Sequence, residues 1–124
     1  MTTHRTPRVR RVYDPPEKAD GVRVLVDRLW PRGLSKEHAA VDEWLKDLTP
    51  STELRRWYHE DRTRFEEFQE RYEAELAGPE PSRALDRLRD LVKEHTLTLV
   101  TAAKDVDHSH LPTLLSALQG GRSC

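Results

Sequence analysis

The fold is decided by the stretch Gly21-Val-Arg-Val-Leu-Val-Asp-Arg-Leu-Trp-Pro-Arg-Gly33, in which a short apolar run passes directly into a polar loop. The first six residues are mostly β-branched or apolar, a pattern typical of a buried strand. Pro31 and Gly33 then shape the backbone of the polar part. We therefore predict a buried strand over 21–26 and, directly after it, a compact charged loop.

Two other stretches have strand character. The run from Arg8 to Tyr13 alternates loosely and stops at Asp14-Pro15-Pro16, because proline cannot continue a strand ladder. The run from Thr96 to Thr101 is again β-branched and apolar. Val41–Leu48 is ambiguous, since its apolar residues fit helical spacing while a fourth strand running into Pro50 fits nearly as well.

Four helices are predicted from apolar spacing and from capping residues. They are a short helix capped by Ser51, one from near Asp61 to Gly78-Pro79, one capped by Ser82, and one from Leu111 to Gly120. Strands near both ends of the chain, with helices between and after them, indicate an α/β fold. We expect one compact layered domain over 8–119, with a short, mostly parallel sheet flanked by helices. Residues 1–7 and 120–124 are expected to be flexible.

Charge is unevenly distributed along the chain. The net charge is only −1, but residues 1–36 carry nine Lys/Arg against four Asp/Glu, which makes this third the place to search for an anion site. The apolar runs are far shorter than the roughly 20 residues that a membrane span requires, and the N-terminus lacks the apolar core of a signal peptide. The single cysteine, Cys124, cannot form an intrachain disulfide. We therefore expect a cytoplasmic protein with no membrane partner.

Each predicted strand is followed at once by polar residues, and ligands of open α/β sheets bind beyond the carboxyl ends of the strands. After the second strand, Arg28, Arg32 and Lys36 could hold a phosphate or carboxylate, since arginine offers a planar pair of donors to such anions. Trp30 could stack on a ring, and Ser35 could cap a helix. The alternative is a surface loop in which Arg28 pairs with a carboxylate and Trp30 fills the core.

The third strand is followed by a cluster of two carboxylates and two imidazoles, Asp105, Asp107, His108 and His110. These are ligand types for zinc or another divalent metal, with Asp107 and His110 as candidates, but their spacing matches no defined metal motif. A structural alternative is a helix start capped by Asp107 or Ser109. Either histidine could instead act as a general acid or base near neutral pH. The sequence therefore leaves open whether the protein binds a divalent metal or another cofactor.

Several blocks of the sequence resemble the domain-of-unknown-function 488 (YeaO-like) family. They are Tyr13-Asp-Pro15, Arg23-Val-Leu-Val-Asp-Arg-Leu-Trp-Pro-Arg-Gly33, Trp44-Leu-Lys-Asp47, Pro50-Ser-x-x-Leu-Arg-x-Trp57 and Ala103-Lys-Asp105. The resemblance covers about residues 8–119 and implies a compact α/β domain without an established activity. Another branch of that family carries a cysteine between the two histidines and an arginine after the second. Ser109 and Leu111 stand at those positions, so thiol chemistry is not expected.

Two functions fit these observations. The first is binding of, or reaction on, a small anionic and phosphate- or nucleotide-like ligand at the strand carboxyl ends. Arg28, Arg32, Lys36 and Lys104 would hold the anion, with Trp30 beside it, and Asp27, Asp105 and His108 would be the candidates for proton transfer. The alternative is a nucleic-acid-binding module that uses the basic N-terminal third. The clusters meet in one site only if the strands are parallel.

Overall fold

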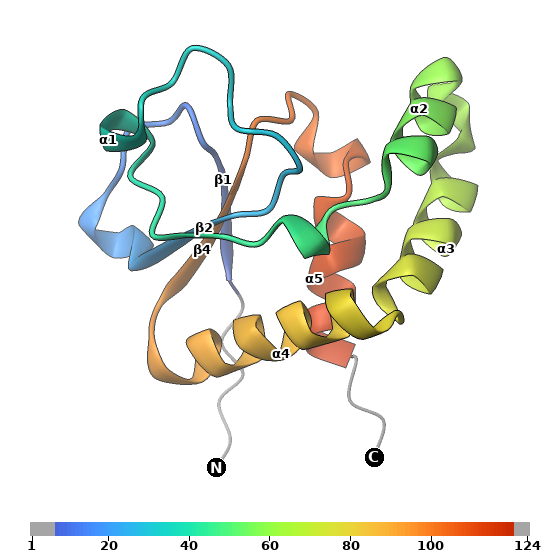
Figure 1. Ribbon diagram of the computed structural model, residues 1–124. Coiled ribbons are helices and arrows are strands. Elements are labelled where there is room, and N and C mark those ends of the chain that lie inside the picture. The colour runs from blue at the N-terminus through green and yellow to red at the C-terminus, as the bar shows by residue number, and fades with distance from the viewer. Residues whose placement is uncertain (1–6, 121–124) are drawn as a thin grey trace.

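The fold is built on a four-stranded sheet in the order β1-β4-β2-β3, in which every strand is parallel to its neighbours. Figure 1 labels β1, β2 and β4 of this sheet. The computed structural model describes residues 7–120, and of Gly120 only the backbone. The strands are β1 (Arg8–Arg11), β2 (Val22–Leu25), β3 (Glu43–Trp44) and β4 (Leu97–Thr101). The α/β fold with a parallel sheet is thus confirmed, and the parallel arrangement brings the carboxyl ends of all strands to one edge.

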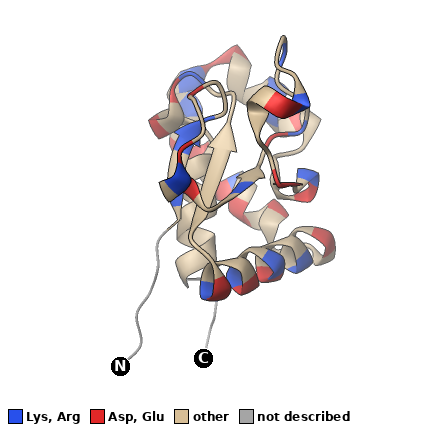
Figure 2. Ribbon diagram, turned by 90° about the vertical axis from the view of Figure 1, so that its left-hand side faces the viewer, with Lys and Arg blue, Asp and Glu red and all other residues tan. Residues whose placement is uncertain are grey.

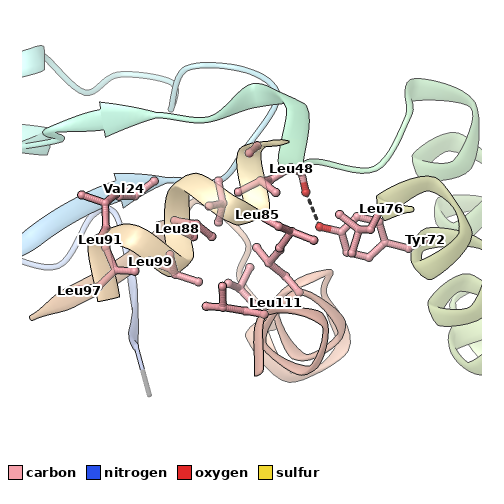
Figure 3. Close-up of a cluster of buried hydrophobic side chains, with 14 of the residues drawn as sticks. Val24, Leu48, Tyr72, Leu76, Leu85, Leu88, Leu91, Leu97, Leu99 and Leu111 are labelled. Atoms are coloured by element: carbon pink, nitrogen blue, oxygen red, sulfur yellow. Dashed lines mark hydrogen bonds between the residues drawn. The ribbon is translucent and has the colours of Figure 1, made fainter. Parts of the chain in front are cut away.

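One face of the sheet is covered by helices. Val24 of β2 and Leu97 and Leu99 of β4 pack against α4 and α5, through side chains such as Leu88 and Leu111 (Figure 3). The helices are α2 (Thr52–Glu60), α3 (Phe65–Leu76), α4 (Pro79–Glu94) and α5 (Leu111–Gly120). Because β4 is buried along its whole length, its sequence is a nearly continuous apolar and β-branched run.

The opposite face is covered mainly by the chain between β2 and β3, which contains only one short helix, α1 (Lys36–Ala39). A second, smaller core forms there around Leu25 and Val100, with Trp30 and Trp44 packed against it. The two indole rings meet edge to face with centroids 5.5 Å apart. The chain therefore leaves β2 toward one face of the sheet and leaves β4, through α5, toward the other. Such a divergence between neighbouring strands opens a crevice at their carboxyl ends.

Single turns of 3-10 helix connect these elements. They are η1 (Lys18–Asp20), η2 (Lys46–Leu48), η3 (Arg62–Arg64) and η4 (Val106–His108). Val41–Leu48, which the sequence left ambiguous, contains both the two-residue strand β3 and the turn η2. The first strand ends at Arg11, two residues earlier than predicted, and the chain then turns: the Asp14 N–H donates to the Arg11 carbonyl, and the Asp14 carboxylate accepts from the Arg11 N–H.

The prediction that Ser82 caps a helix is wrong. Helix α4 begins at Pro79, four residues earlier than a helix capped by Ser82 would, and this position suits proline because the first N–H groups of a helix have no partner within it. The Ser82 hydroxyl instead lies inside the helix and donates to the Leu76 carbonyl of α3. By contrast, Ser35 and Ser51 cap α1 and α2, accepting from the His38 and Leu54 N–H groups as expected.

Charges of both signs are interspersed over the surface, most visibly along α4 (Figure 2). Over the described part of the chain, no helix combines the length and the apolar character needed to cross a bilayer. The segments expected to be flexible fall largely on residues 1–6 and 121–124, outside the described residues.

Candidate functional site

Asp27 ties the carboxyl ends of the two central strands together. One carboxylate oxygen accepts from the Thr101 hydroxyl at 2.6 Å and the other from the Ala102 N–H at 2.7 Å. The main-chain carbonyl of Asp27 accepts from the Trp44 indole at 2.6 Å. These three bonds hold the end of β2 between β4 and β3, so the Asp27 side chain positions the edge of the sheet from which the site is built.

The loop that follows is fixed by its own polar contacts. The Arg28 guanidinium donates to the Pro50 carbonyl at 3.3 Å, and the Trp30 indole donates to the Leu34 carbonyl at 2.7 Å. Gly33 has a φ of 76° and open space around it, so glycine is needed there for the backbone conformation and not for room. Arg28 pairs with no carboxylate of residues 7–120, whereas Trp30 does pack against the smaller core, as one alternative reading proposed.

The segment after β4 places its two histidines differently. His108 is exposed, and its Nδ1 lies 3.0 Å from a carboxylate oxygen of Asp105. His110 is largely buried, its Nε2 lies 2.6 Å from the Val26 carbonyl, and Asp27 is 3.7 Å away. Burial lowers the pKa of His110 below its usual value, and the nearby Arg55 charge acts in the same direction. The Val26 carbonyl and Asp27 oppose that shift but do not overcome it, so His110 is a neutral ring that donates from Nε2 at neutral pH.

All three segments face one hollow of about 500 Å³ at the carboxyl edge of the sheet. We call it the strand-end hollow. Of the residues singled out from the sequence, those that line it are Asp27, Arg28, Trp30, Arg32, Lys104, Asp105, His108 and His110. Lys36 and Asp107 are not among its lining residues; Lys36 begins α1, and Asp107 lies within η4. Parallel strands thus bring together clusters that are about 75 residues apart in the sequence.

The sequence interpretation missed the contribution of α2 and η3. Arg55, Tyr58, His59 and Arg62 also line the strand-end hollow. Tyr58 donates its hydroxyl to the His108 carbonyl at 2.8 Å, and the Arg62 guanidinium lies over the Tyr58 ring. Charged side chains on a helix mostly face solvent, and the candidate residues predicted from the sequence include none from this segment. Arg55, His59 and Arg62, spaced by four and three residues, nevertheless put three basic side chains on one side of the chain, which is a pattern that could have been followed.

The side chains that line the strand-end hollow carry more positive than negative charge. Its lining contains the five cations Arg28, Arg32, Arg55, Arg62 and Lys104, but only two carboxylates, Asp27 and Asp105. Asp27 is held by Thr101 and Ala102, and Asp105 lies beside His108. None of the five cations forms an ion pair with a carboxylate of residues 7–120. The hollow therefore carries an excess of positive charge that its two carboxylates do not neutralise.

The residues do not favour a metal centre. Among the described residues, no group of three His, Cys, Asp or Glu side chains is arranged to hold a metal ion. His110, one of the two metal candidates, uses Nε2 on the Val26 carbonyl, and Asp107 lies outside the strand-end hollow. The Ser109 hydroxyl donates to the Val106 carbonyl and accepts from the Leu111 N–H, so it forms the start of α5.

A parallel α/β domain with a basic hollow at its strand ends defines the class of protein, and sequence comparisons give the family. Residues 7–121 match the family described as the inactive DUF488-N3 subclade. The uncharacterized protein YeaO of Escherichia coli is 47% identical over 110 residues, which cover 89% of this chain and 94% of that protein. Uncharacterized proteins of Mycobacterium bovis and Mycobacterium tuberculosis are also 47% identical, over 91% of this chain and 93% of each relative.

The chain therefore belongs to the DUF488 family, and to its YeaO-like members. No solved structure matches it.

Proposed function

We propose that this protein binds a small phosphate-bearing anion in the strand-end hollow. The observation that carries the proposal is the presence of five cations without a carboxylate partner among the described residues. Elsewhere, Arg64, Arg71, Arg87 and Arg89 are each paired with a carboxylate, at distances of 2.7 to 3.8 Å. Cations gathered in one hollow repel each other, and an anion that accepts their hydrogen bonds relieves that repulsion.

The proposal is for binding without turnover. The family is described as an inactive subclade. At the position where the other branch carries a cysteine, the Ser109 hydroxyl is committed to two main-chain groups, and the Leu111 side chain is fully buried in the core. The cysteine and the arginine of that branch are thus replaced in this chain by two residues with structural contacts. A sensor or carrier of the anion fits this set of residues better than an enzyme.

A second candidate function is proton transfer on the bound anion. It is favoured by the pair His108 and Asp105, because a carboxylate beside one ring nitrogen orients the ring, as in many general acid–base sites. Asp27 is less suited to that role, since both its carboxylate oxygens already accept hydrogen bonds. Chemical change of a bound phosphate ester, lost in His108→Gln, would favour this candidate over binding alone.

The nucleic-acid alternative draws less support from the structure. Arg8 and Arg10 of the basic N-terminal third lie against Asp20 and Glu17, and Arg23 is buried against Asp20. Arg11 donates to the carbonyls of Ala102 and Ala103. These side chains are engaged within the fold, and the extended basic surface that a phosphate backbone requires is correspondingly reduced.

The test is calorimetric titration of the protein with inorganic phosphate and pyrophosphate. Arg55→Gln removes one cation of the strand-end hollow that makes no hydrogen bond to the described residues, so folding should be unaffected. A charge-assisted hydrogen bond is worth about 1.5–3 kcal/mol, so the dissociation constant should rise roughly tenfold to a hundredfold.

Arg56→Gln is the matched control, since Arg56 is the next residue on α2, is exposed, and lies outside the strand-end hollow. Equal affinity of the two variants, or no heat with either anion at millimolar concentration, would refute the proposal.

A further inference from the structure

Two large apolar side chains are exposed within residues 7–120, and both lie at the strand-end hollow. Tyr13 is 42% exposed and Leu29 is 69% exposed. Single exposed apolar residues are ordinary on protein surfaces. Their coincidence with the unpaired cations is more specific, because it places an apolar surface beside a positively charged one. The ligand that fits both has an anionic part and an apolar part.

Tyr13 is held in place by the structure around it. Its hydroxyl donates to the Arg32 carbonyl at 3.1 Å, and the Arg11 guanidinium lies 5.2 Å from the ring centroid. Arg11 is itself fixed, since it donates to the Ala102 and Ala103 carbonyls. A ring that is already immobile loses little conformational entropy when a ligand packs on it. Tyr13 therefore has the properties of a stacking surface for a flat group.

Burial gives the strand-end hollow an inner and an outer end. Its buried lining residues are Pro31, Thr49, Pro50, Tyr58, Phe68, Thr101 and Ser109. Arg28 and Arg55 are half-buried, whereas Tyr13, Leu29 and Arg32 are exposed. The half-buried cations suit an anionic group that enters the hollow, and the exposed apolar pair suits a flat group that stays at its mouth. The volume of about 500 Å³ also exceeds the need of phosphate alone, since whole organic ligands occupy pockets of about 300–1,000 Å³.

We infer that the ligand is an aromatic phosphate, with the phosphate between Arg28 and Arg55 and a flat ring against Tyr13 and Leu29. The inference rests on the proposed anion site and names its ligand class. A nucleoside 5′-monophosphate has this chemistry, and so does the 5′-phosphorylated end of a nucleic-acid strand.

The experiment measures the affinities of four probes by calorimetry: inorganic phosphate, ribose 5-phosphate, adenosine 5′-monophosphate and adenosine. The monophosphate should bind at least fivefold more tightly than ribose 5-phosphate, because stacking of a base on an aromatic side chain corresponds to roughly a fivefold to a hundredfold gain in affinity. Tyr13→Ala should remove most of that gain and leave the affinity for ribose 5-phosphate unchanged.

Tyr13→Phe is the matched control, since it keeps the ring and loses only the hydrogen bond to Arg32. Leu29→Ser is a second variant, and it should fold normally because the Leu29 side chain is mostly exposed. It should weaken the binding of adenosine 5′-monophosphate and leave the binding of ribose 5-phosphate unchanged. Equal affinity of wild-type protein for ribose 5-phosphate and adenosine 5′-monophosphate would overturn the inference while the proposed anion binding stands. Absence of binding by every phosphate probe would overturn both.

A further comparison separates the two sources of the ligand. A 5′-phosphorylated dinucleotide that binds no more tightly than the monophosphate indicates a free nucleotide. A clearly tighter complex, lost when the 5′-phosphate is removed, indicates a strand end. Either result supports the aromatic phosphate.

Discussion

A single buried carboxylate, Asp20, holds three arginines at the end of the sheet away from the strand-end hollow. Its oxygens lie 2.7 Å from the Arg23 guanidinium, 2.9 Å from Arg10 and 3.1 Å from Arg8. Burial by itself would raise the pKa of Asp20, but hydrogen bonds from the Glu17 N–H and Arg23, with the charge of Arg10, keep that pKa below its ordinary value. Asp20 is therefore ionised in the folded protein, and its negative charge compensates the buried positive charge of Arg23.

We expect Asp20→Asn to lower the free energy of unfolding by about 3–5 kcal/mol, because removal of one partner leaves a buried charge uncompensated. Urea denaturation measures the change. Glu17→Gln is the control, since Glu17 pairs with Arg8 while its side chain is half exposed, and a surface pair contributes about 0–1 kcal/mol. A loss no larger than that of the control would show that Arg23 finds other partners.

The same variant tests a pH dependence. A carboxylate whose pKa is depressed on folding stabilises the protein above its unfolded pKa of about 3.9, and this stability is lost as the pH falls through the lower folded value. Wild-type stability should therefore fall through this acid range more steeply than that of Asp20→Asn.

Arg23 shows where prediction from single residues failed. The strand around it was predicted correctly because valine and leucine surround it. Nothing in the local pattern shows that its guanidinium would be buried, donating to the Ala39 and Ala40 carbonyls as well as to Asp20. Those partners depend on tertiary structure. Trp30 is a similar case, since both a stacking surface and a core side chain fitted the sequence.

At the level of elements, the link between α2 and α3 positions one wall of the strand-end hollow. The Ser51 hydroxyl caps α2 by accepting from the Leu54 N–H at 3.1 Å. Glu75 of α3 accepts from both the Ser51 N–H at 2.8 Å and the Ser51 hydroxyl at 2.6 Å. The preceding residue, Pro50, supplies the carbonyl that holds Arg28. The helix cap therefore helps to position Arg28, which is a candidate ligand-binding residue.

Ser51→Ala should destabilise the protein by about 1–2 kcal/mol, the upper part of the range for loss of a helix cap, because the bond to Glu75 is lost as well. Thermal and urea unfolding provide the measurement. Thr52→Ala at the next position should change stability little, since the Thr52 side chain is exposed and makes no hydrogen bond to the described residues. Similar effects of the two substitutions would argue against the cap.

The elements themselves were largely predictable, and their exceptions have local causes. The buried strands and the helix caps at Ser35 and Ser51 follow from residue types that have few alternatives. Ser82 was misassigned because a serine in the first turn of a helix looks like a cap, while Pro79 had already begun α4. The two-residue strand β3 is too short to leave a pattern in the sequence.

At the scale of the molecule, the meeting of strand ends could be expected only on the condition that the strands are parallel. The strand order β1-β4-β2-β3 places the last strand between the first two, and no local pattern encodes it. The spacing of the basic residues on α2 and η3 puts them on one side of the chain, but no local pattern shows that this side faces the sheet edge, because packing of α2 there is a tertiary property.

This arrangement also separates small-anion binding from a nucleic-acid surface. An interface that neutralises several phosphates of a single strand loses affinity log-linearly with salt, with a slope of about −0.7 per phosphate. The strand-end hollow is about 500 Å³ and holds one anionic group in the proposed mode, so a 20-nucleotide DNA without a 5′-phosphate should bind weakly at physiological ionic strength. We expect adenosine 5′-monophosphate to lose only severalfold in affinity between 50 and 200 mM salt, on the order of one or two such contacts.

Fluorescence anisotropy with the oligonucleotide and calorimetry with the monophosphate provide the two curves of affinity against salt concentration. Lys18→Gln is a useful variant, since Lys18 is an exposed cation of the N-terminal third outside the hollow and should affect neither curve. Submicromolar binding of the oligonucleotide with a slope steeper than about −4, weakened by Lys18→Gln, would instead identify the basic third of the chain as the binding surface.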